Sequence, residues 1–290
     1  MLKNVLKTRR QKVFWSTVAV FVVLLATVGL VSYFSEPRYG GRRLTDWLLE
    51  YHVSAYNDHP GEAAVAEKAL REIGTNAIPT LVRMLFPMDR SLPVARMLEA
   101  ARVPLDFVED DSARITYHVI ALNGFYLLGP TASNALPLLL PHLNDPERAR
   151  YVSEAIKFIG APALGPVTEI LASTNSTAKR QAVRILFSIS GRELTTFSNL
   201  LAHADPLVRG EAYLYLVVSQ IPAEVRQELF LKGLNDPDSY VVSRAAIAIA
   251  NLRSEATNFL PRLYELSTST NALLAAEIRA SIKRIEKGVK

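Results

Sequence analysis

Apolar residues form one uninterrupted run near the N-terminus, and beyond it they recur with helical spacing almost to the end of the chain. The run from Val13 to Phe34 holds 22 residues without a charge. At about 1.5 Å per residue it makes a helix of about 33 Å, long enough to cross the hydrocarbon core of a bilayer. Trp15 and Tyr33 lie near its two ends, where aromatic side chains favour the membrane interface. The pattern predicts a transmembrane helix over residues 13–34.

Two other interpretations fit an apolar N-terminal run. A cleaved signal peptide has a shorter apolar region of about 7 to 15 residues that ends in small residues. Cleavage near Val31 or Ser35 stays open, although the bulky Tyr33-Phe34 pair is a poor end for such a site. A buried core helix fits less well, because uniformly apolar stretches of this length are typical of membrane spans. We therefore expect an uncleaved anchor.

Basic residues are concentrated before the apolar run. The first twelve residues contain five of the 33 lysines and arginines and no acid, so the other 28 basic residues balance the 28 acidic ones. A chain whose formal charge of +5 lies in a short tail is a poor candidate for nucleic-acid binding. Basic residues before a span also favour its cytoplasmic side. We expect a basic cytoplasmic tail over residues 1–12 and the large C-terminal part on the periplasmic side of a bacterial inner membrane. Display toward the cytoplasm is the alternative, because three arginines follow the span: Arg38, Arg42 and Arg43.

A short turn motif recurs in the second half of the chain, at a period of about 30 residues. It reads Asn144-Asp145-Pro146, Ala204-Asp205-Pro206 and Asn235-Asp236-Pro237, with Thr174-Asn175 midway between the first two. Asp or Asn caps a helix through its side-chain oxygen, and Pro fits the first helical position. Each motif therefore predicts the start of a helix. Small residues recur at matching places in these helices, as close stacking requires: Ala182, Ala212 and Ala245.

Glycine and proline divide each repeat into two helices. The first helix ends at a glycine, and the second opens near a proline. The glycines are Gly74, Gly129 and Gly160, and the prolines are Pro79, Pro137, Pro166 and Pro261.

These residues resemble the HEAT-repeat family, in particular the short bacterial repeat that phycobilisome-lyase proteins also contain. The resemblance rests on ALREIGTNAIPTLVRML (69–85), ALNGFYLLGPTASNALPLLLPHLND (121–145), AIKFIGAPALGPVTEIL (155–171) and DPLVRGEA (205–212). The opening EPRYGGRRLTDWLLEY (36–51) is similar to membrane-anchored HEAT proteins of the Verrucomicrobia and their relatives. The resemblance implies an all-α fold, with an α-solenoid of about six to seven helical hairpins over residues 45–290. Residues 35–44 are then a linker behind the transmembrane helix.

The ends of such an array need polar caps, and its middle contains one irregular stretch. We expect Thr45 to cap the first helix and Asn271 to cap the last. Residues 87–117 depart from the period and hold either a degenerate repeat, Val94 to Ala101, or an insertion.

Residues with catalytic or metal-binding chemistry are scattered. The chain has no cysteine. The acidic run Glu109-Asp110-Asp111 lacks the ligand pattern of a calcium loop, so we expect it to cap a helix that begins near Ser112. The five histidines show no ligand spacing and are expected at the surface or at helix ends: His52, His59, His118, His142 and His203. We therefore predict no catalytic residue, metal ligand or cofactor.

Basic residues follow three of the turn motifs by four or five positions. They could form a polar stripe for an anionic partner, but the pattern resembles the Asp and Arg ladder that links successive HEAT-like repeats. We predict this structural ladder from Asp145, Arg150, Lys179, Asp205, Arg209 and Asp236. Aromatic residues at helical spacing are predicted to belong to the core: Phe158, Phe187, Tyr213, Tyr215 and Phe230.

Solenoids usually bind other proteins along one long face. Helical phase places one position of each second helix on such a face, and these form the predicted partner surface: Arg83, Pro141, Glu169, Asn199, Lys232 and Tyr264. The leading hypothesis is a membrane-anchored protein-protein interaction scaffold without catalytic activity, whose protein partner is unidentified. The alternative is an enzyme with its active site in the solenoid groove, as in lyase-like or glycosylase-like HEAT proteins, which would require clustered acids and aromatics.

Overall fold

The computed structural model describes residues 36–86, 111–190 and 194–288. In these ranges the chain is mostly helical with almost no strand, which confirms the predicted all-α class. The basic tail (1–12), the transmembrane helix (13–34) and the degenerate repeat Val94 to Ala101 lie outside the described residues. Within the described ranges, no single helix is both long and apolar enough to span a membrane. The bent pair Pro146–Ile159 and Ala161–Ala172 passes both criteria together, with a bend of 119°.

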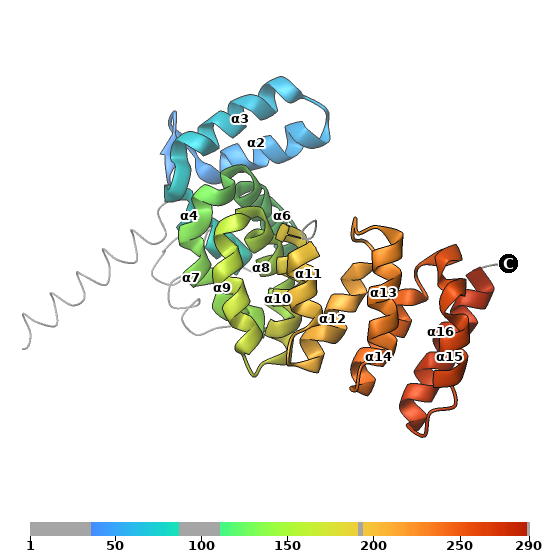
Figure 1. The fold of residues 1–290 in the computed structure, drawn as a ribbon. Coiled ribbons are helices and arrows are strands. Elements are labelled where there is room, and N and C mark those ends of the chain that lie inside the picture. The colour runs from blue at the N-terminus through green and yellow to red at the C-terminus, as the bar shows by residue number, and fades with distance from the viewer. Residues whose placement is uncertain (1–35, 87–110, 191–193, 289–290) are drawn as a thin grey trace, which may run out of the picture. The chain divides into compact units, whose positions relative to one another are not determined.

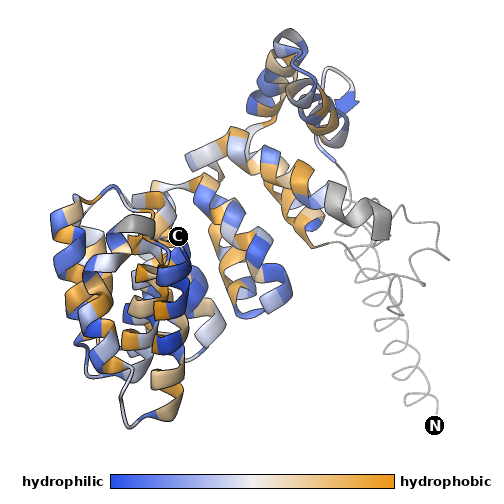
Figure 2. Ribbon diagram, turned by 90° about the vertical axis from the view of Figure 1, so that its right-hand side faces the viewer, coloured by the Kyte–Doolittle hydropathy of each residue, from blue (hydrophilic) through white to orange (hydrophobic). Residues whose placement is uncertain are grey.

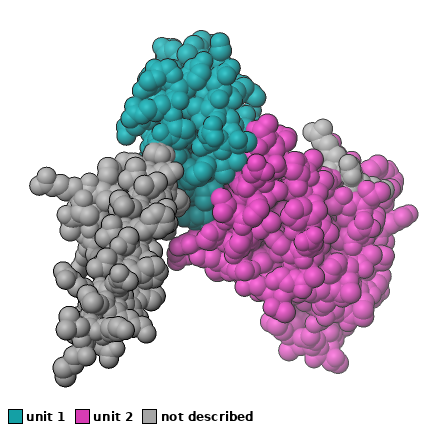
Figure 3. All heavy atoms as spheres, turned by 90° about the vertical axis from the view of Figure 1, so that its left-hand side faces the viewer, with its two compact units in different colours: residues 1–128 teal, residues 129–290 magenta. Residues whose placement is uncertain are grey.

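The chain forms two compact units, with the boundary between Leu128 and Gly129 (Figure 3). The described elements of the first unit are β1 (Arg38–Tyr39), β2 (Arg42–Arg43), α2 (Leu44–Tyr56), α3 (Pro60–Ile73), the 3-10 helix η1 (Gly74–Ala77), α4 (Ile78–Leu85) and α6 (Asp111–Leu128). Helix α2 packs on α3 and α6, and α4 packs on α6.

A two-stranded hairpin opens the first unit, in a stretch predicted to be a linker. Strand β1 pairs antiparallel with β2, so that Tyr39 lies opposite Arg42. Gly40 and Gly41 form its turn with φ of 57° and 80°, which glycine adopts readily. The Trp47 indole donates a hydrogen bond to the Tyr39 carbonyl at 3.0 Å, and the Arg42 guanidinium carbon lies 4.0 Å from the Trp47 ring centroid. These contacts attach the hairpin to α2.

The predicted cap at Thr45 is wrong. Helix α2 begins at Leu44, and its N-cap is Arg43, two residues before the predicted cap. The Arg43 amide donates to Asp46 Oδ2 at 3.1 Å. The Thr45 hydroxyl donates to Glu36 Oε2 at 2.7 Å instead. Because Asp46 supplies a carboxylate inside the first turn, the helix start does not need the threonine side chain.

The second unit consists of successive helix pairs (Figure 1). Its elements are η2 (Gly129–Ala135), α7 (Leu136–Leu139), η3 (Leu140–Asn144), α8 (Pro146–Ile159), η4 (Ala161–Ala163), α9 (Leu164–Glu169), η5 (Ile170–Ala172), α10 (Ser176–Ser190), α11 (Leu194–Leu201), α12 (Pro206–Leu216), α13 (Ala223–Leu234), α14 (Ser239–Ile249), η6 (Arg253–Phe259), α15 (Leu260–Leu266) and α16 (Ala272–Gly288).

The helices of the second unit fall into two groups. Helices α8, α10, α12, α14 and α16, called the first helices below, each pack on the next. The second helices are α9 with η5, α11, α13 and α15, and they pack mainly on the first helices. Apolar residues form stripes along the helices, with polar residues on their other faces (Figure 2). Ala182, Ala212 and Ala245 are at most 1% exposed, so the small residues lie where the first helices meet, as predicted.

Glycine and asparagine set the helix ends that the sequence predicts. Gly74, Gly129 and Gly160 have φ of 58°, 52° and 74°, in the region that favours glycine, and each follows the end of a helix. Asn271 Oδ1 accepts a hydrogen bond from the Leu274 amide at 3.2 Å and so caps α16. These predictions are confirmed because they depend on the chemistry of only a few consecutive residues.

Candidate functional site

Three of the predicted turn motifs start a helix through a side-chain cap. Asp145, Asn175 and Asp205 accept hydrogen bonds from backbone amides in the first turns of α8, α10 and α12. Pro146 and Pro206 are the first residues of α8 and α12, where the missing amide hydrogen has no partner to lose. The predicted starts of these helices are confirmed.

Asp205 caps α12 with one carboxylate oxygen, and its second oxygen binds the preceding first helix, α10. Lys179 of α10 donates a hydrogen bond to Asp205 Oδ2, and both side chains are mostly buried. This hydrogen bond, together with the one from the Leu207 amide, holds the pKa of Asp205 below its ordinary value. One carboxylate therefore starts α12 and attaches α10 to it.

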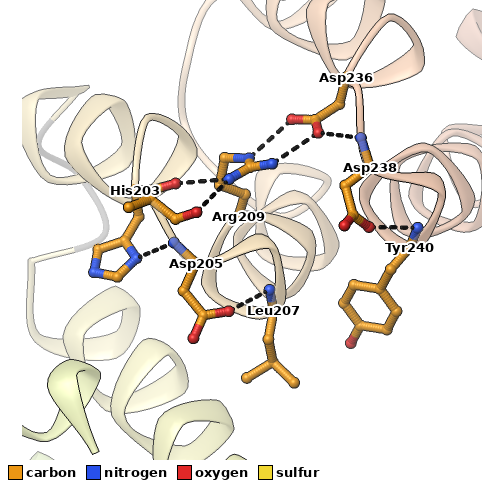
Figure 4. A network of polar contacts seen from close by, with 8 residues as sticks. His203, Asp205, Leu207, Arg209, Asp236, Asp238 and Tyr240 are labelled. Carbon is orange, nitrogen blue, oxygen red and sulfur yellow. Dashed lines mark hydrogen bonds and ion pairs between the residues drawn. The ribbon is translucent and has the colours of Figure 1, made fainter.

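Arg209 makes the same kind of connection one repeat later (Figure 4). Its guanidinium donates two hydrogen bonds to Asp236, at 2.9 and 2.8 Å, and a third nitrogen lies 2.9 Å from the His203 and Ala204 carbonyls. The bonds to Asp236 raise the pKa of Arg209. Burial alone would raise the pKa of Asp236, but its bonds to Arg209 and to the Asp238 amide lower it. Figure 4 shows the guanidinium between the turn before α12 and the turn before α14.

The turn motif Asn235-Asp236-Pro237 starts its helix two residues later than predicted. Helix α14 begins at Ser239, and Asp238 is its cap, accepting a hydrogen bond from the Tyr240 amide at 2.9 Å. Asp236 does not cap α14, because its carboxylate is occupied by Arg209 and by the Asp238 amide. The next carboxylate along the chain takes its place.

Among the described residues, Asp145 and Arg150 of the predicted ladder form no ion pair with another helix pair. Asp145 pairs with Arg148 of its own helix at 3.4 Å. The guanidinium carbon of Arg150 lies 6.0 Å from the Tyr151 ring centroid, and Arg150 forms no ion pair with a described residue. The following turn offers the neutral Asn175 in place of a carboxylate, so Arg150 has no acid there to bind.

A second set of polar contacts joins the first helices, and the sequence analysis missed it. We call it the first-helix network. Arg184 of α10 pairs with Glu154 of α8, which also binds Lys157 at 2.5 Å. Glu211 of α12 lies 3.4 Å from Arg180 of α10 and 2.6 Å from Arg244 of α14. Its members are Glu154, Lys157, Arg180, Arg184, Glu211 and Arg244.

Aligning the successive repeats of this sequence with one another could have revealed the network. Partners on neighbouring helices are separated by about one repeat period: 30 residues for Glu154 and Arg184, and 33 for Glu211 and Arg244. Opposite charges one period apart lie next to each other once the helices stack. Each carboxylate of the network is shared by two cations.

A cavity of about 400 Å³ lies between second helices and α10. The Thr168 and Ser190 hydroxyls on its wall each donate to a carbonyl of their own helix at 2.7 Å. The Asn199 side chain, at the same wall, forms no hydrogen bond with a described residue. The lining is otherwise largely apolar: Leu164, Leu171, Ala172, Leu186, Thr196, Leu200 and His203 complete it.

The residues of the predicted partner surface differ in exposure. Arg83 is 6% exposed, so its predicted place on a binding face is wrong, and it donates to the Thr80 hydroxyl at 3.1 Å. The short helix α4 buries most of its length, including the position where an exposed residue was expected. The other positions are exposed: Pro141, Glu169, Asn199, Lys232 and Tyr264.

One histidine also departs from its predicted place. His118 is 3% exposed, and its Nε2 lies 3.1 Å from the Leu85 carbonyl. His203 Nδ1 accepts a hydrogen bond from the Asp205 amide at 3.1 Å, so this ring supports the turn before α12. Within the described ranges, no group of three or more His, Asp or Glu side chains is placed to hold a metal ion.

Three of the five aromatic residues assigned to the core are only half-buried. Tyr213 and Phe230 are at most 1% exposed, as predicted, whereas Phe158, Phe187 and Tyr215 retain solvent contact. Phe187 and Tyr215 stack on each other with ring centroids 5.0 Å apart. Helical spacing does not separate the middle of a buried stripe from its edge, which explains the error.

Comparisons with protein-family models, with curated proteins and with solved structures find no match to this chain.

Proposed function

We propose that this chain is a membrane-anchored scaffold for protein-protein interaction, built on a HEAT-like α-solenoid. The observation that supports the proposal most directly is the repeated packing of the second unit. Each first helix packs on the next, while the second helices pack mainly on the first helices. Such a stack offers a continuous row of second-helix surfaces to a partner.

The contacts among the charged residues of the stack support a structural role, rather than a catalytic one, for most of these residues. Lys179 binds Asp205, Arg209 binds Asp236, and the first-helix network joins four successive first helices. These ion pairs fix how one helix pair sits on the next. A partner then recognises the exposed side chains between them, for which Glu169, Asn199, Lys232 and Tyr264 are the candidates.

The cavity beside Asn199 is the most distinctive feature of this candidate surface. Concave sites with an apolar lining and a few polar groups are typical of binding pockets. Its two wall hydroxyls are engaged with their own helices, so the lining presents mostly hydrocarbon. An apolar side chain of a protein partner would fill this cavity, and the side-chain amide of Asn199 would form a hydrogen bond with the partner.

The anchor sets where this binding takes place. The charge-free run over residues 13–34, with its basic flank, would hold the protein in a bacterial inner membrane with the N-terminus in the cytoplasm. The repeats would then face the periplasm. A reporter enzyme fused after Lys290 tests this orientation, because periplasmic alkaline phosphatase activity is expected, and activity only of a cytoplasmic reporter would contradict it.

Site-specific photocrosslinking in intact membranes tests the scaffold function. A photoreactive amino acid at Glu169, Asn199 or Lys232 is expected to capture one and the same protein. Thr174 and Asn235, which are exposed in turns of the same unit, are the matched control positions. Equal capture at the turn positions, or no capture above background at any position, would contradict the proposal.

A further inference from the structure

The first-helix network contains more positive than negative charge, and its cations stay accessible. It has four cations, Lys157 and three arginines, against two carboxylates, so its formal charge is +2. The side chains of Arg180, Arg184 and Arg244 are 44%, 29% and 27% exposed. Because a guanidinium has five N–H donors, each arginine retains donors beyond those its carboxylate uses.

A tyrosine of α12 interacts with the charged groups of this network. Tyr215 of α12 interacts electrostatically with Arg184 of α10, with Glu211 of its own helix and with Arg244 of α14. Its ring stacks on Phe187, which fixes its position, and its hydroxyl forms no hydrogen bond with a residue that the structure describes. By contrast, the nearby Tyr240 hydroxyl donates to Glu211 at 2.6 Å. Tyr215 is thus a positioned hydroxyl beside the network.

We infer that the first-helix network, with Tyr215 at its edge, binds an extended acidic segment of a protein partner. This inference rests on the proposed scaffold function, and it names the chemistry of the partner and a second surface for it. Carboxylates of the segment accept hydrogen bonds from the free donors of Arg180, Arg184 and Arg244, and bonds of this kind are among the stronger ones in proteins. The Tyr215 hydroxyl donates to the carboxylate between Arg184 and Arg244.

The spacing of the network selects the acids in the segment. Packed helices lie about 8 to 10 Å apart, and an extended chain advances about 3.3 Å per residue. Acidic residues three positions apart therefore advance by one first helix at each step. The outer two of three such residues meet Arg184 of α10 and Arg244 of α14, and the middle one meets the Tyr215 hydroxyl of α12. Nucleic acid fits less well, because its closely spaced phosphates would also meet the carboxylates of Glu154 and Glu211.

Peptide binding to the purified full chain tests the inference. The probe is the synthetic peptide GESTESTEG with a fluorescent label, in which glutamate recurs every third residue, and binding is followed by fluorescence anisotropy. The glutamine peptide GQSTQSTQG is expected to bind at least about tenfold more weakly, because it loses every charge-assisted bond. The peptide GEEESTSTG has the same composition with clustered acids and is expected to bind more weakly than the spaced one.

Variants identify the surface. Arg184→Gln with Arg244→Gln is expected to weaken binding about tenfold, because two charged donors are lost. Tyr215→Phe keeps the ring stack and is expected to weaken it about threefold at unchanged thermal stability. Lys68→Gln removes one exposed cation from α3, outside both the network and the predicted partner surface, and should leave peptide affinity unchanged.

Equal affinity for the glutamate and glutamine peptides would overturn the inference, and so would unchanged affinity in both network variants. A loss in Lys68→Gln as large as that in the arginine variant would also overturn it. The same holds if a short DNA duplex binds more tightly than GESTESTEG and this binding is lost in the same variants. The proposed scaffold function fails separately, because it is measured by crosslinking at Glu169, Asn199 and Lys232 in membranes. Specific crosslinks there without peptide binding would refute this inference alone.

Discussion

Arg209→Met is the substitution that most directly tests how the helix pairs are joined. Methionine keeps most of the apolar stem of arginine but removes the guanidinium. The change abolishes both hydrogen bonds to Asp236 and those to the carbonyls of His203 and Ala204. It leaves Asp236 with the Asp238 amide as its remaining hydrogen-bond donor in the described chain.

The expected cost follows from the burial of the pair. The side chains of Arg209 and Asp236 are 14% and 12% exposed, so water replaces the lost partner only in part. Removing one member of a buried ion pair costs about 3 to 5 kcal/mol. Because Asp236 keeps one hydrogen bond and some exposure, we expect the lower end, about 3 kcal/mol of unfolding free energy.

Hydrogen exchange measured by mass spectrometry locates the effect. A loss of about 3 kcal/mol corresponds to about a hundredfold increase in the opening equilibrium. The increase is expected in peptides from α12, α13 and α14, which Arg209 and Asp236 connect, and should be smaller in α8, because neighbouring interfaces carry the stability of a stack.

Arg262→Met is the matched control for this prediction. Arg262 pairs with Glu265 of the same helix, and the two side chains are 36% and 66% exposed. Pairs of this kind contribute about 0.2 to 1 kcal/mol. If Arg209→Met raises exchange no more than Arg262→Met does, or raises it equally in α8 and α12, the connection between Arg209 and Asp236 does not hold neighbouring helix pairs together.

Two further predictions concern acid stability and a glycine. The pKa values of Asp205 and Asp236 are lowered in the folded chain, so their stabilisation is present above the unfolded value of about 4 and is lost as the pH falls through the folded value. Urea midpoints should therefore fall between pH 5 and pH 3 by less in Arg209→Met than in the parent chain, and equal changes would refute this account. A Cβ at Gly210 would lie 2.6 Å from a Tyr240 ring carbon and 3.1 Å from Arg244 Cγ, so Gly210→Ala is expected to cost about 1 to 3 kcal/mol in urea unfolding. Gly165→Ala in α9 meets no atom within 4 Å and should be neutral or stabilising by up to about 1 kcal/mol, and a similar loss in both variants would contradict the packing argument.

Local chemistry explains which parts of the fold could be predicted from the sequence. A cap such as Asp145 or Asn271 binds an amide two or three residues away, and a glycine such as Gly160 ends a helix through its own backbone angle. These features require no knowledge of the neighbouring repeat. The period of the turn motifs then placed Lys179 and Arg209 near the correct turns, where the structure pairs them with Asp205 and Asp236.

The missed features depend on three-dimensional packing. Whether Arg83 is exposed depends on how completely neighbouring elements cover the short helix α4, which helical phase does not reveal. The choice between Asp236 and Asp238 as the cap depends on an arginine 27 residues earlier in the chain. Competition between an arginine and backbone amides, as donors, for one carboxylate acceptor cannot be read from a single motif.

The half-buried aromatic pair shows how an error of this kind can point to function. Phe187 and Tyr215 have the spacing of core residues, yet they stack at the edge of the first-helix network. A tyrosine chosen only for packing would have no need of its hydroxyl at such a place, and phenylalanine would bury the same ring without a polar group to solvate. The hydroxyl of Tyr215, which interacts electrostatically with Arg184, Glu211 and Arg244, would donate to an acceptor of the bound segment. Tyr215→Phe therefore distinguishes a packing residue from a binding one, because it should leave folding unchanged and weaken only the capture of an acidic segment.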